Sequence, residues 1–370
     1  MRNYSHIVIG GGPAGATAAE HLAVSGQKVL VIEKSVAHPF REKPCGGGLG
    51  PITTKLFPYT KSQGVHTTSK VAMSLGKDRI EASVPIVMVD RDKFDFYLLE
   101  RAMRSGAKVF FGATVKSIDT KAKLVVLTNG QRIDYKYLIC AGGFTCPSSK
   151  MVEGEKKNVP LIVGKADGGK LNASDTAEII FFEKLNGYAW IFPKGKFLDV
   201  GIGGDSPLSL QKELLEKLLR ERGLKLYDRA GWGLPFEVDT IEPVIGSGAM
   251  LAGDAAGFVN PATGEGIRYA MQSGLEAAEV VLGKRSIEDY PSFLETLCRL
   301  EVSRDKIISQ GMRKSFDAMK ANPELVSETI GFFFEDKEPP ERKPMSDEQR
   351  LEAYKKISES IPGNNSKGEQ

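Results

Sequence analysis

The sequence predicts an α/β fold in which a parallel sheet covered by helices is joined to a second lobe built on an antiparallel sheet. Residues 5–34 run as a short apolar strand, a glycine-rich turn, an Ala-rich helix and a second apolar strand. This order is a βαβ unit, whose parallel strands imply a sheet covered by helices. From about residue 160 to 245 the pattern changes to strands with alternating apolar residues around one amphipathic helix, which is typical of an antiparallel sheet with a covered face.

The elements of the first lobe follow from apolar runs bounded by glycine and turn residues. The strongest local turn signal is Asn129-Gly130, a dipeptide that favours a tight hairpin between two strands. A helix that starts at Arg91 would carry Phe94 and Leu98 on one face. In chain order we expect strands at 6–9, 28–33, 108–111, 114–119, 123–128, 131–135, 137–141 and 250–253, and helices at 14–25, 91–106 and 266–282.

The second lobe is expected to interrupt the first along the chain. Its clearest element is a helix over 208–222, with a stripe of leucines that would cover the sheet. After Tyr290 the pattern is helical, and the polar end of the chain is typical of disorder. We therefore expect a discontinuous nucleotide-binding domain (1–50, 86–160 and 245–290), a second domain on the antiparallel sheet (51–85 and 161–244), a helical C-terminal region (291–363) and a disordered tail (364–370).

Charge and hydropathy limit the partners that we expect. The chain of 370 residues has 50 basic and 47 acidic residues, a balance that argues against a nucleic-acid partner but leaves a weak attraction to anionic lipid headgroups. No apolar stretch approaches the ~20 residues of a membrane span, and the first apolar run leads straight into glycines rather than a cleavage site. We expect a cytoplasmic protein, with any membrane contact peripheral and at the inner membrane face.

The cysteines and histidines indicate no metal site. Cys45, Cys140, Cys146 and Cys298 form no C-x-x-C pair, so their spacing predicts neither zinc nor an iron–sulfur cluster. Scattered single cysteines are typical of a reduced intracellular protein. The four histidines also lack the spacing of metal ligands.

The first glycine-rich turn predicts a dinucleotide site. Gly10-x-Gly12-x-x-Gly15 lies between a strand and a helix, the context in which glycines let the backbone approach a pyrophosphate at the helix N-terminus. Ala14 belongs to the same loop, and Glu33 ends the second strand, where a carboxylate can accept hydrogen bonds from a ribose diol. The motif alone does not distinguish FAD from NAD.

A second glycine-rich turn decides for FAD. Gly253-Asp254 follows an apolar strand, and this places the Asp254 carboxylate where it can bind a polyol hydroxyl. A helix starting near Gly266 and Ile267 would direct its positive N-terminal end at the N1/C2=O edge of a flavin.

Together the two turns resemble those of the glutathione-reductase-like FAD superfamily, in the branch of monooxygenases and geranylgeranyl reductases. The resemblance covers residues 5–290 and implies a Rossmann-type FAD-binding domain with an antiparallel-sheet substrate lobe. It also implies that Arg91 lies near the cofactor and that the backbone of Val115 meets the adenine.

Two further motifs resemble those of geranylgeranyl reductases. Lys43-Pro44-Cys45-Gly46-Gly47-Gly48 looks like their P-C-G-G-G loop, which implies that Cys45, Gly46 and Gly48 lie beside the isoalloxazine. Tyr188-x-Trp190-x-Phe192-Pro193, followed by Val200-Gly201-x-Gly203, matches their Y-x-W-x-F-P…V-G-x-G pattern. Period-two spacing puts the three aromatic rings on one face of a strand, where they form an apolar wall suited to a polyprenyl chain.

One departure concerns the strand on the adenine side. Many relatives carry Asp-Gly after this strand, whereas this chain has Ala141-Gly142-Gly143-Phe144. The resemblance therefore predicts no detail of how a reductant docks.

The resemblance implies reduction of isolated C=C bonds in an isoprenoid lipid or prenyl diphosphate. Reduced FAD would deliver a hydride from N5, and Cys45, Glu265 or a water would supply the proton. NADPH, ferredoxin or another carrier would supply the electrons. Two alternatives remain: an aromatic hydroxylase or halogenase of the same superfamily, and a cluster-free flavoprotein that passes electrons to quinone.

Overall fold

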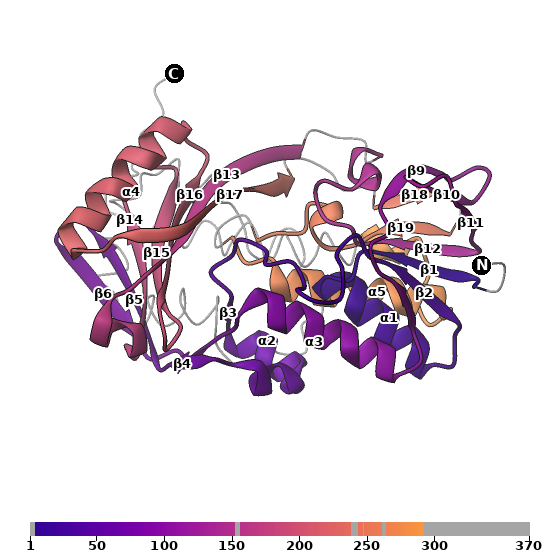
Figure 1. The fold of residues 1–370 in the computed structure, drawn as a ribbon, viewed down its shortest axis with the longest axis horizontal. Helices are drawn as coiled ribbons and strands as arrows, with labels where there is room; N and C mark the ends of the chain where they lie inside the picture. The colour runs from indigo at the N-terminus through magenta and orange to yellow at the C-terminus, as the bar shows by residue number, and fades with distance from the viewer. Residues whose placement is uncertain (1–3, 152–155, 238–242, 247, 261–263, 292–370) are drawn as a thin grey trace, which may run out of the picture.

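The computed structural model describes residues 4–151, 156–237, 243–246, 248–260 and 264–291, and two large sheets organise this part of the chain (Figure 1). The first sheet has six strands in the order β18-β19-β12-β1-β2-β8. All neighbours in it are parallel except β18 and β19. Its strands are β1 (His6–Ile9), β2 (Val29–Ile32), β8 (Lys108–Phe110), β12 (Tyr137–Cys140), β18 (Val244–Gly246) and β19 (Ala249–Leu251).

Three helices lie on one side of the six-stranded sheet: α1 (Pro13–Val24), α3 (Arg91–Arg104) and α5 (Ile267–Val281) (Figure 1). Helices α1 and α5 pack closely because α5 has a glycine where they meet: a Cβ at Gly274 would lie 2.1 Å from the Ala14 carbonyl oxygen. A three-stranded antiparallel sheet, β11-β10-β9, lies on the other side (Figure 1). Its strands are β9 (Val115–Asp119), β10 (Leu124–Leu127) and β11 (Arg132–Asp134).

The second large sheet has seven strands in the order β17-β13-β16-β15-β14-β5-β6. Helix α4 (Leu208–Arg222) covers one face, where its four buried leucines pack on Ala189, Ile191, Val200 and Ile202. The strands are β5 (Lys70–Leu75), β6 (Asp78–Ala82), β13 (Lys156–Ala166), β14 (Thr176–Phe181), β15 (Gly187–Pro193), β16 (Leu198–Gly204) and β17 (Leu226–Glu237).

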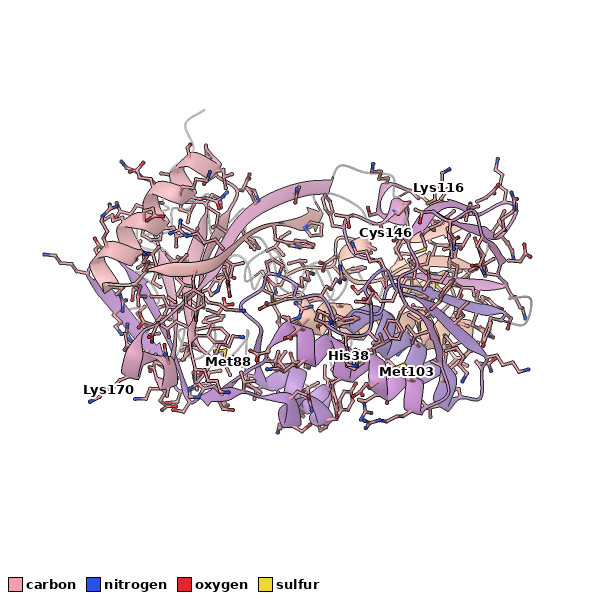
Figure 2. All side chains as sticks on the ribbon, viewed as in Figure 1. His38, Met88, Met103, Lys116, Cys146 and Lys170 are labelled. Carbon is pink, nitrogen blue, oxygen red and sulfur yellow. The ribbon has the colours of Figure 1, made fainter. Side chains whose placement is uncertain are left out.

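A small sheet connects the two lobes. It has the order β3-β7-β4, with strands β3 (Gly48–Leu49), β4 (His66–Thr68) and β7 (Ile86–Met88). Figure 2 shows Met88 between the lobes, and this fully buried side chain packs in a cluster with Val71, Met73 and Leu75 of β5. The remaining short elements are α2 (Pro51–Leu56), η1 (Pro58–Gln63), η2 (Pro147–Lys150), η3 (Gly169–Ala173) and η4 (Gly253–Ala255).

Most predicted elements of the described chain are confirmed. Helix α4 begins and ends at the predicted residues, and the β10–β11 hairpin turns at Gly130, whose φ is +83°. The predicted antiparallel second sheet is confirmed, with one pair that differs, because β5 runs parallel to β14. The two strands reach the sheet from distant parts of the chain, so no hairpin constrains their direction.

Three expectations remain untested. The helical region 291–363 lies outside the described residues apart from its first residue, and the tail 364–370 lies wholly outside them. The domain boundaries also stay a prediction. Within the described ranges, no helix is long and apolar enough to cross a membrane.

Candidate active site

The first glycine turn is shaped by close backbone contacts at two positions and is open at a third. A Cβ at Gly15 would lie 1.9 Å from the Gly10 carbonyl oxygen, and one at Gly10, whose φ is +93°, would lie 2.5 Å from the Ala141 carbonyl oxygen. A Cβ at Gly12 would have no neighbour within 4 Å among the described atoms. Gly12 precedes α1 and provides no side-chain cap. The turn therefore leaves space in front of unpaired backbone N–H groups, as a pyrophosphate requires.

Glu33 lies beside this turn, as predicted. It is 1% exposed, and its Oε2 accepts a hydrogen bond from the Gly11 N–H at 2.6 Å while its Oε1 accepts one from the Ser35 N–H at 2.7 Å. A carboxylate oxygen has a second lone pair that can accept a further hydrogen bond. The predicted adenine-side residue, Val115, begins β9, and Ala113 just before it donates its N–H to the Glu33 carbonyl at 2.9 Å.

The second glycine turn packs against the first. Gly253 has a φ of +60°, and a Cβ there would lie 3.1 Å from the Ala14 Cβ. The next residue, Asp254, forms an ion pair with Lys43, the residue that begins the predicted Cys45 loop. No sequence pattern predicts this ion pair, which connects the Cys45 loop to the second glycine turn.

Helix α5 begins next to Asp254. Its first residue is Ile267, and Gly266 before it provides no side-chain cap. A Cβ at Gly266 would lie 3.7 Å from Asp254 Oδ1. The uncapped N-terminus of α5 is thus at the position predicted to face the edge of a flavin.

The Cys45 loop lies directly on the aromatic side chains of β15. A Cβ at Gly46 would lie 2.8 Å from the Phe192 ring and 3.3 Å from Trp190 Nε1, and one at Gly48 would lie 3.7 Å from the Phe192 ring. Glycine at these positions allows the loop to approach the rings closely. The structure therefore brings together two motifs that are far apart in the sequence.

The other end of the aromatic wall meets the loop before α5. A Cβ at Gly264 would lie 3.0 Å from Tyr188 Oη. The adjacent Glu265 accepts a hydrogen bond from Thr53 Oγ1 at 3.2 Å and forms an ion pair with Arg268 at 3.3 Å. The Cys45 loop, the aromatic wall and the segment around Gly264 therefore converge.

The V-G-x-G motif on β16 makes room for the wall. Trp190 is paired with Gly201 and Tyr188 with Gly203. A Cβ at Gly201 would lie 2.2 Å from the Trp190 ring. The alternate residues of β15 pack on α4, so the aromatic rings point to the opposite face of the sheet. A buried apolar cluster continues across that face: Leu161, Val163 and Trp190, with Tyr188, Phe192, Ala230, Trp232 and Leu234 against them.

Cys45 has two buried cations near it. Burial alone would lower the pKa of Arg91, but attraction to Asp95 and then to Cys45, with hydrogen bonds to both, raises that pKa overall. Arg91 also forms two hydrogen bonds to Asp95, of 2.9 and 2.8 Å. Lys194 is 4% exposed and donates a hydrogen bond to the Val89 carbonyl at 2.7 Å. Burial lowers the pKa of Lys194, and attraction to Asp199 and, more weakly, to Cys45 opposes that shift. Arg91 therefore lies near Cys45 in the predicted site.

Sequence reasoning missed two charged residues of this site, Lys194 and Asp199. Asp199 is 8% exposed and accepts a hydrogen bond from Trp190 Nε1 at 2.7 Å. Burial raises the pKa of Asp199 to about 6, although Lys194 and the Trp190 hydrogen bond oppose this shift. A signal was present for Asp199, which places a charge within the apolar strand β16, whereas Lys194 directly follows the end of β15.

Comparisons with known proteins identify the family of this chain. Residues 4–186 match the family model described as pyridine nucleotide-disulphide oxidoreductase. The chain is 30% identical over 328 residues to the digeranylgeranylglycerophospholipid reductase of Methanocaldococcus jannaschii, covering 80% of this chain and 81% of that relative. It is 29% identical over 300 residues to the geranylgeranyl diphosphate reductase of Rhodobacter capsulatus, covering 75% of each chain.

Solved structures show the same fold. A geranylgeranyl bacteriochlorophyll reductase-like protein from Thermoplasma acidophilum superposes with a TM-score of 0.64 at 23% identity, covering 98% of this chain and 99% of that one. A flavin-dependent brominase superposes with a TM-score of 0.71 at 19% identity, covering 96% of this chain and 99% of that one. At these identities the likeness concerns the fold alone, which is that of Rossmann-type FAD-binding proteins.

Proposed function

This chain belongs to the geranylgeranyl reductase family of FAD-dependent oxidoreductases, and on that premise we propose that it reduces isolated C=C bonds in the isoprenoid chain of a lipid or prenyl diphosphate. The observation that carries the proposal is the convergence of three segments. The Cys45 loop contacts Phe192 through Gly46, and Tyr188 contacts the loop before α5 at Gly264. A flavin held by the two glycine turns would thus lie close to an apolar wall.

FAD is the proposed cofactor, and the described residues fit it. The space at Gly12, the buried Glu33 and the uncapped start of α5 are suited to a pyrophosphate, a ribose and an electron-rich flavin edge. When bound and reduced, FAD supplies a hydride from N5. We propose as its binding residues Gly10, Gly12, Ala14, Gly15, Glu33, Cys45, Gly46, Gly48, Arg91, Val115, Gly253, Asp254, Gly266 and Ile267.

The aromatic wall is the proposed substrate surface. The two relatives are named for reduction of geranylgeranyl diphosphate and of a digeranylgeranylglycerophospholipid, and we extend that class of substrate to this chain. Tyr188, Trp190 and Phe192 would orient the polyprenyl chain and exclude water from it. An isolated alkene is not polarised, so orientation and the exclusion of water must provide much of the rate enhancement.

The side chains proposed from the sequence as catalytic, Cys45 and Glu265, have different surroundings. Glu265 accepts a hydrogen bond at one oxygen from Thr53 and pairs with Arg268 through the other. Cys45 lies on the loop against the wall, with its Sγ 3.3 Å from the Gly47 N–H. We propose that Cys45 contacts the reacting centre and that Glu265 holds the segment before α5 in place.

The electron donor and a membrane contact complete the proposal. NADPH, ferredoxin or another carrier would reduce the flavin. A peripheral contact with anionic lipid would give access to lipid substrates. It is supported by the exposed side chain of Leu171. The adjacent Lys170 lies at the far end of the seven-stranded lobe (Figure 2). Co-sedimentation with anionic vesicles would test this contact, and recovery of all protein in the supernatant would contradict it.

The direct test is anaerobic incubation of dithionite-reduced protein with geranylgeranyl diphosphate or an unsaturated phospholipid ether. Alkene reduction adds two hydrogens per bond, so we expect product masses that rise in steps of two hydrogens. Oxygen consumption with a hydroxylated product would instead identify a monooxygenase. Quinone reduction without loss of alkene would identify an electron-transfer flavoprotein.

The proposed role of Cys45 has its own test. Cys45→Ala should bind FAD, with an unchanged flavin spectrum, and lose alkene reduction by about 100-fold or more, as expected for removal of a group at the reacting centre. Cys140→Ala is the control, because Cys140 is fully buried in β12. Equal turnover of Cys45→Ala and the wild type would exclude a catalytic role for the thiol.

A further inference from the structure

Asp199 is a buried carboxyl group on the substrate face of the seven-stranded sheet. It lies on β16 directly opposite Phe192 of β15, and Trp190 is paired with Gly201 on the same two strands. The alternate residues of β16, Val200 and Ile202, point to the other face and pack on α4. Alternation along the strand therefore places Asp199 on the face that carries the aromatic wall.

The hydrogen bonding of Asp199 leaves one oxygen available. Oδ1 accepts the Trp190 Nε1–H at 2.7 Å, and Oδ2 has no hydrogen-bond partner among the described residues. Trp190 Nε1 is also the atom that would lie 3.3 Å from a Cβ at Gly46. The carboxyl group thus lies one hydrogen bond away from the loop that carries Cys45.

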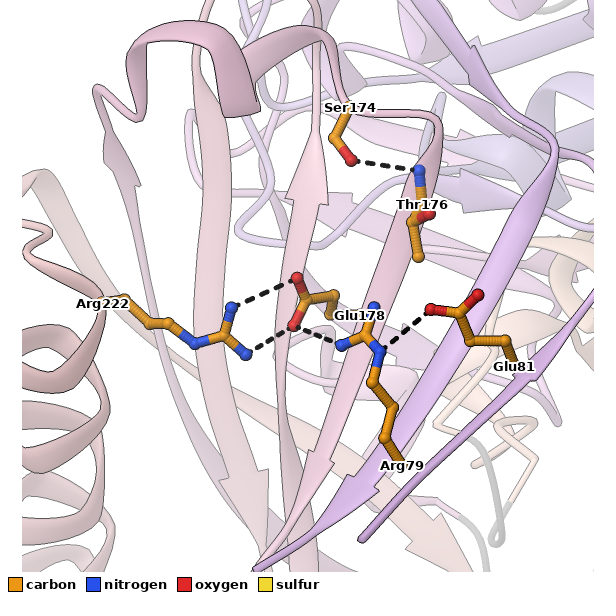
Figure 3. Close-up of polar contacts among 6 residues, drawn as sticks. All are labelled: Arg79, Glu81, Ser174, Thr176, Glu178 and Arg222. Atoms are coloured by element: carbon orange, nitrogen blue, oxygen red, sulfur yellow. Dashed lines mark hydrogen bonds and ion pairs between the residues drawn. The ribbon is translucent and has the colours of Figure 1, made fainter. Parts of the chain in front are cut away.

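Another acid of the same sheet, Glu178, lies between two arginines. Glu178 on β14 faces α4, and it accepts hydrogen bonds from Arg222 at 2.6 Å and from Arg79 at 3.4 Å (Figure 3). Asp199 forms no ion pair within 4.0 Å with any described residue. Two arginines therefore pair with Glu178, whereas Asp199 is buried in surroundings that favour the neutral acid.

The charged groups around Asp199 act in both directions. Burial is the largest influence and raises its pKa to about 6, Lys194 and Lys165 oppose that shift, and Glu42 adds to it. Lys194, in turn, interacts electrostatically with Cys45, Asp90 and Arg91. An acid that titrates near neutral pH can both hold a proton and release it, which is the requirement for a general acid.

We propose that Asp199 donates the proton in the alkene reduction. This inference rests on the proposed function. One alkene carbon receives the hydride with its two electrons, the π bond breaks, and the other carbon forms a C–H bond with the Asp199 proton. The O–H bond of Asp199 breaks and leaves a carboxylate, FAD is left oxidised, and water restores the proton. Lys194 would stabilise the carboxylate formed in this step.

The test is Asp199→Asn, because asparagine keeps an oxygen that can accept the Trp190 hydrogen bond but carries no transferable proton. The assay is single-turnover oxidation of the reduced flavin by geranylgeranyl diphosphate under anaerobic conditions. We expect flavin binding to be unchanged and the rate to fall about 100-fold or more. Glu178→Gln, on the opposite face of the sheet, should react at the wild-type rate.

The pH dependence gives the second readout. The acid must be protonated to donate, so the wild-type rate should fall as pH rises above about 6. In Asp199→Asn this decline should be absent. A wild-type rate that stays constant from pH 5 to 8 would overturn the proposal, even if the Asp199→Asn variant could not be purified.

A third readout does not depend on activity. The chain contains two tryptophans, so Trp232→Phe leaves Trp190 as the single indole. Its fluorescence should titrate with a midpoint near pH 6, because ionisation of Asp199 changes the hydrogen bond to Nε1. Addition of Asp199→Asn should abolish the titration, and its persistence would count against the proposal.

The two possible failures are distinguishable. If the wild type does not reduce geranylgeranyl diphosphate or a phospholipid ether, the proposed function is wrong. If the wild type reduces either substrate and Asp199→Asn keeps the same rate and pH profile, the assignment of Asp199 alone is wrong.

Discussion

At the scale of single residues, the glycines of the first turn have different roles. Gly10 and Gly15 allow backbone segments to approach more closely than any Cβ would permit. Gly12 has an ordinary φ of −75° and open space around it, so no contact within the described part of the chain requires glycine there. The space at Gly12 is therefore best explained by a ligand.

Gly12→Ala tests this explanation. Because the added methyl group meets no described atom, the variant should fold with nearly wild-type stability. The methyl group would enter the proposed pyrophosphate space, and we expect FAD affinity to fall about tenfold or more. Gly231→Ala is the control. Gly231 lies in the other lobe, and a Cβ there would have its nearest neighbour at 3.9 Å. Equal FAD affinity of the two variants, measured by flavin fluorescence, would place the pyrophosphate elsewhere.

Asp199 also makes a prediction about stability. Its pKa is raised from 3.8 to about 6 on folding, so its neutral form stabilises the folded state below pH 4 and this contribution is lost as pH rises through 6. Asp199→Asn removes this pH-dependent loss of stability, because asparagine does not titrate. Relative to the wild type, the variant should therefore gain about 2–3 kcal/mol of unfolding free energy between pH 4 and pH 8.

Urea unfolding of both proteins at the two pH values measures the difference. Comparison of the variant with the wild type cancels the contributions of all other titrating groups. A pH-independent difference between the two would show that folding leaves the pKa of Asp199 unchanged.

At the scale of elements, the wall depends on the pairing of β15 with β16. Tyr188 and Trp190 lie opposite glycines of β16, and the Trp190 ring lies over Gly201. Large and small residues on neighbouring strands fill the same layer without overlap. The spacing of the two motifs is therefore a packing requirement of this face of the sheet.

Gly201→Ala should disrupt this pairing. A Cβ at this position would lie 2.2 Å from the Trp190 ring and 2.7 Å from the Ile162 carbonyl oxygen. The ring must move, and we expect a loss of about 1–3 kcal/mol in unfolding free energy. The near-ultraviolet circular dichroism of the indole should change as well. Gly231→Ala, on β17 of the same sheet, should leave both properties unchanged, and an unaltered Gly201→Ala spectrum would contradict the proposed contact.

At the scale of the whole molecule, segments from distant parts of the chain form one site. The first turn and the second turn contact each other at Ala14 and Gly253, and Lys43 is paired with Asp254. A cofactor that contacts both turns would hold these segments together. Its binding energy would then add to the stability of the fold.

Removal of FAD should therefore lower the melting temperature. A ligand at 100 times its dissociation constant stabilises a protein by about 2.7 kcal/mol, and at 1,000 times by about 4 kcal/mol. We expect the melting temperature of the apoprotein to rise with added FAD, and Gly12→Ala to shift this response to higher FAD concentrations. A melting temperature that does not depend on FAD would argue against binding across the two turns.

The sequence by itself determined the local features of this protein. Apolar periodicity and turn residues predicted helix α4 at its observed bounds, and glycine spacing predicted both turns, because these signals act between residues that are close in the chain. The four motifs also predicted the parts of the site, and their resemblance to a family, which the comparisons confirm, indicated its chemistry.

Only the tertiary structure decided how those parts meet. The parallel pairing of β5 with β14, the Lys43–Asp254 ion pair and the contact between Gly46 and Phe192 all join segments that no local pattern relates. The surroundings of Asp199 are also formed by segments that no local pattern relates. The pKa of Asp199 is raised mainly because the fold removes the carboxyl group from water, and burial is a property of the packed sheet rather than of the residues beside Asp199 in the sequence.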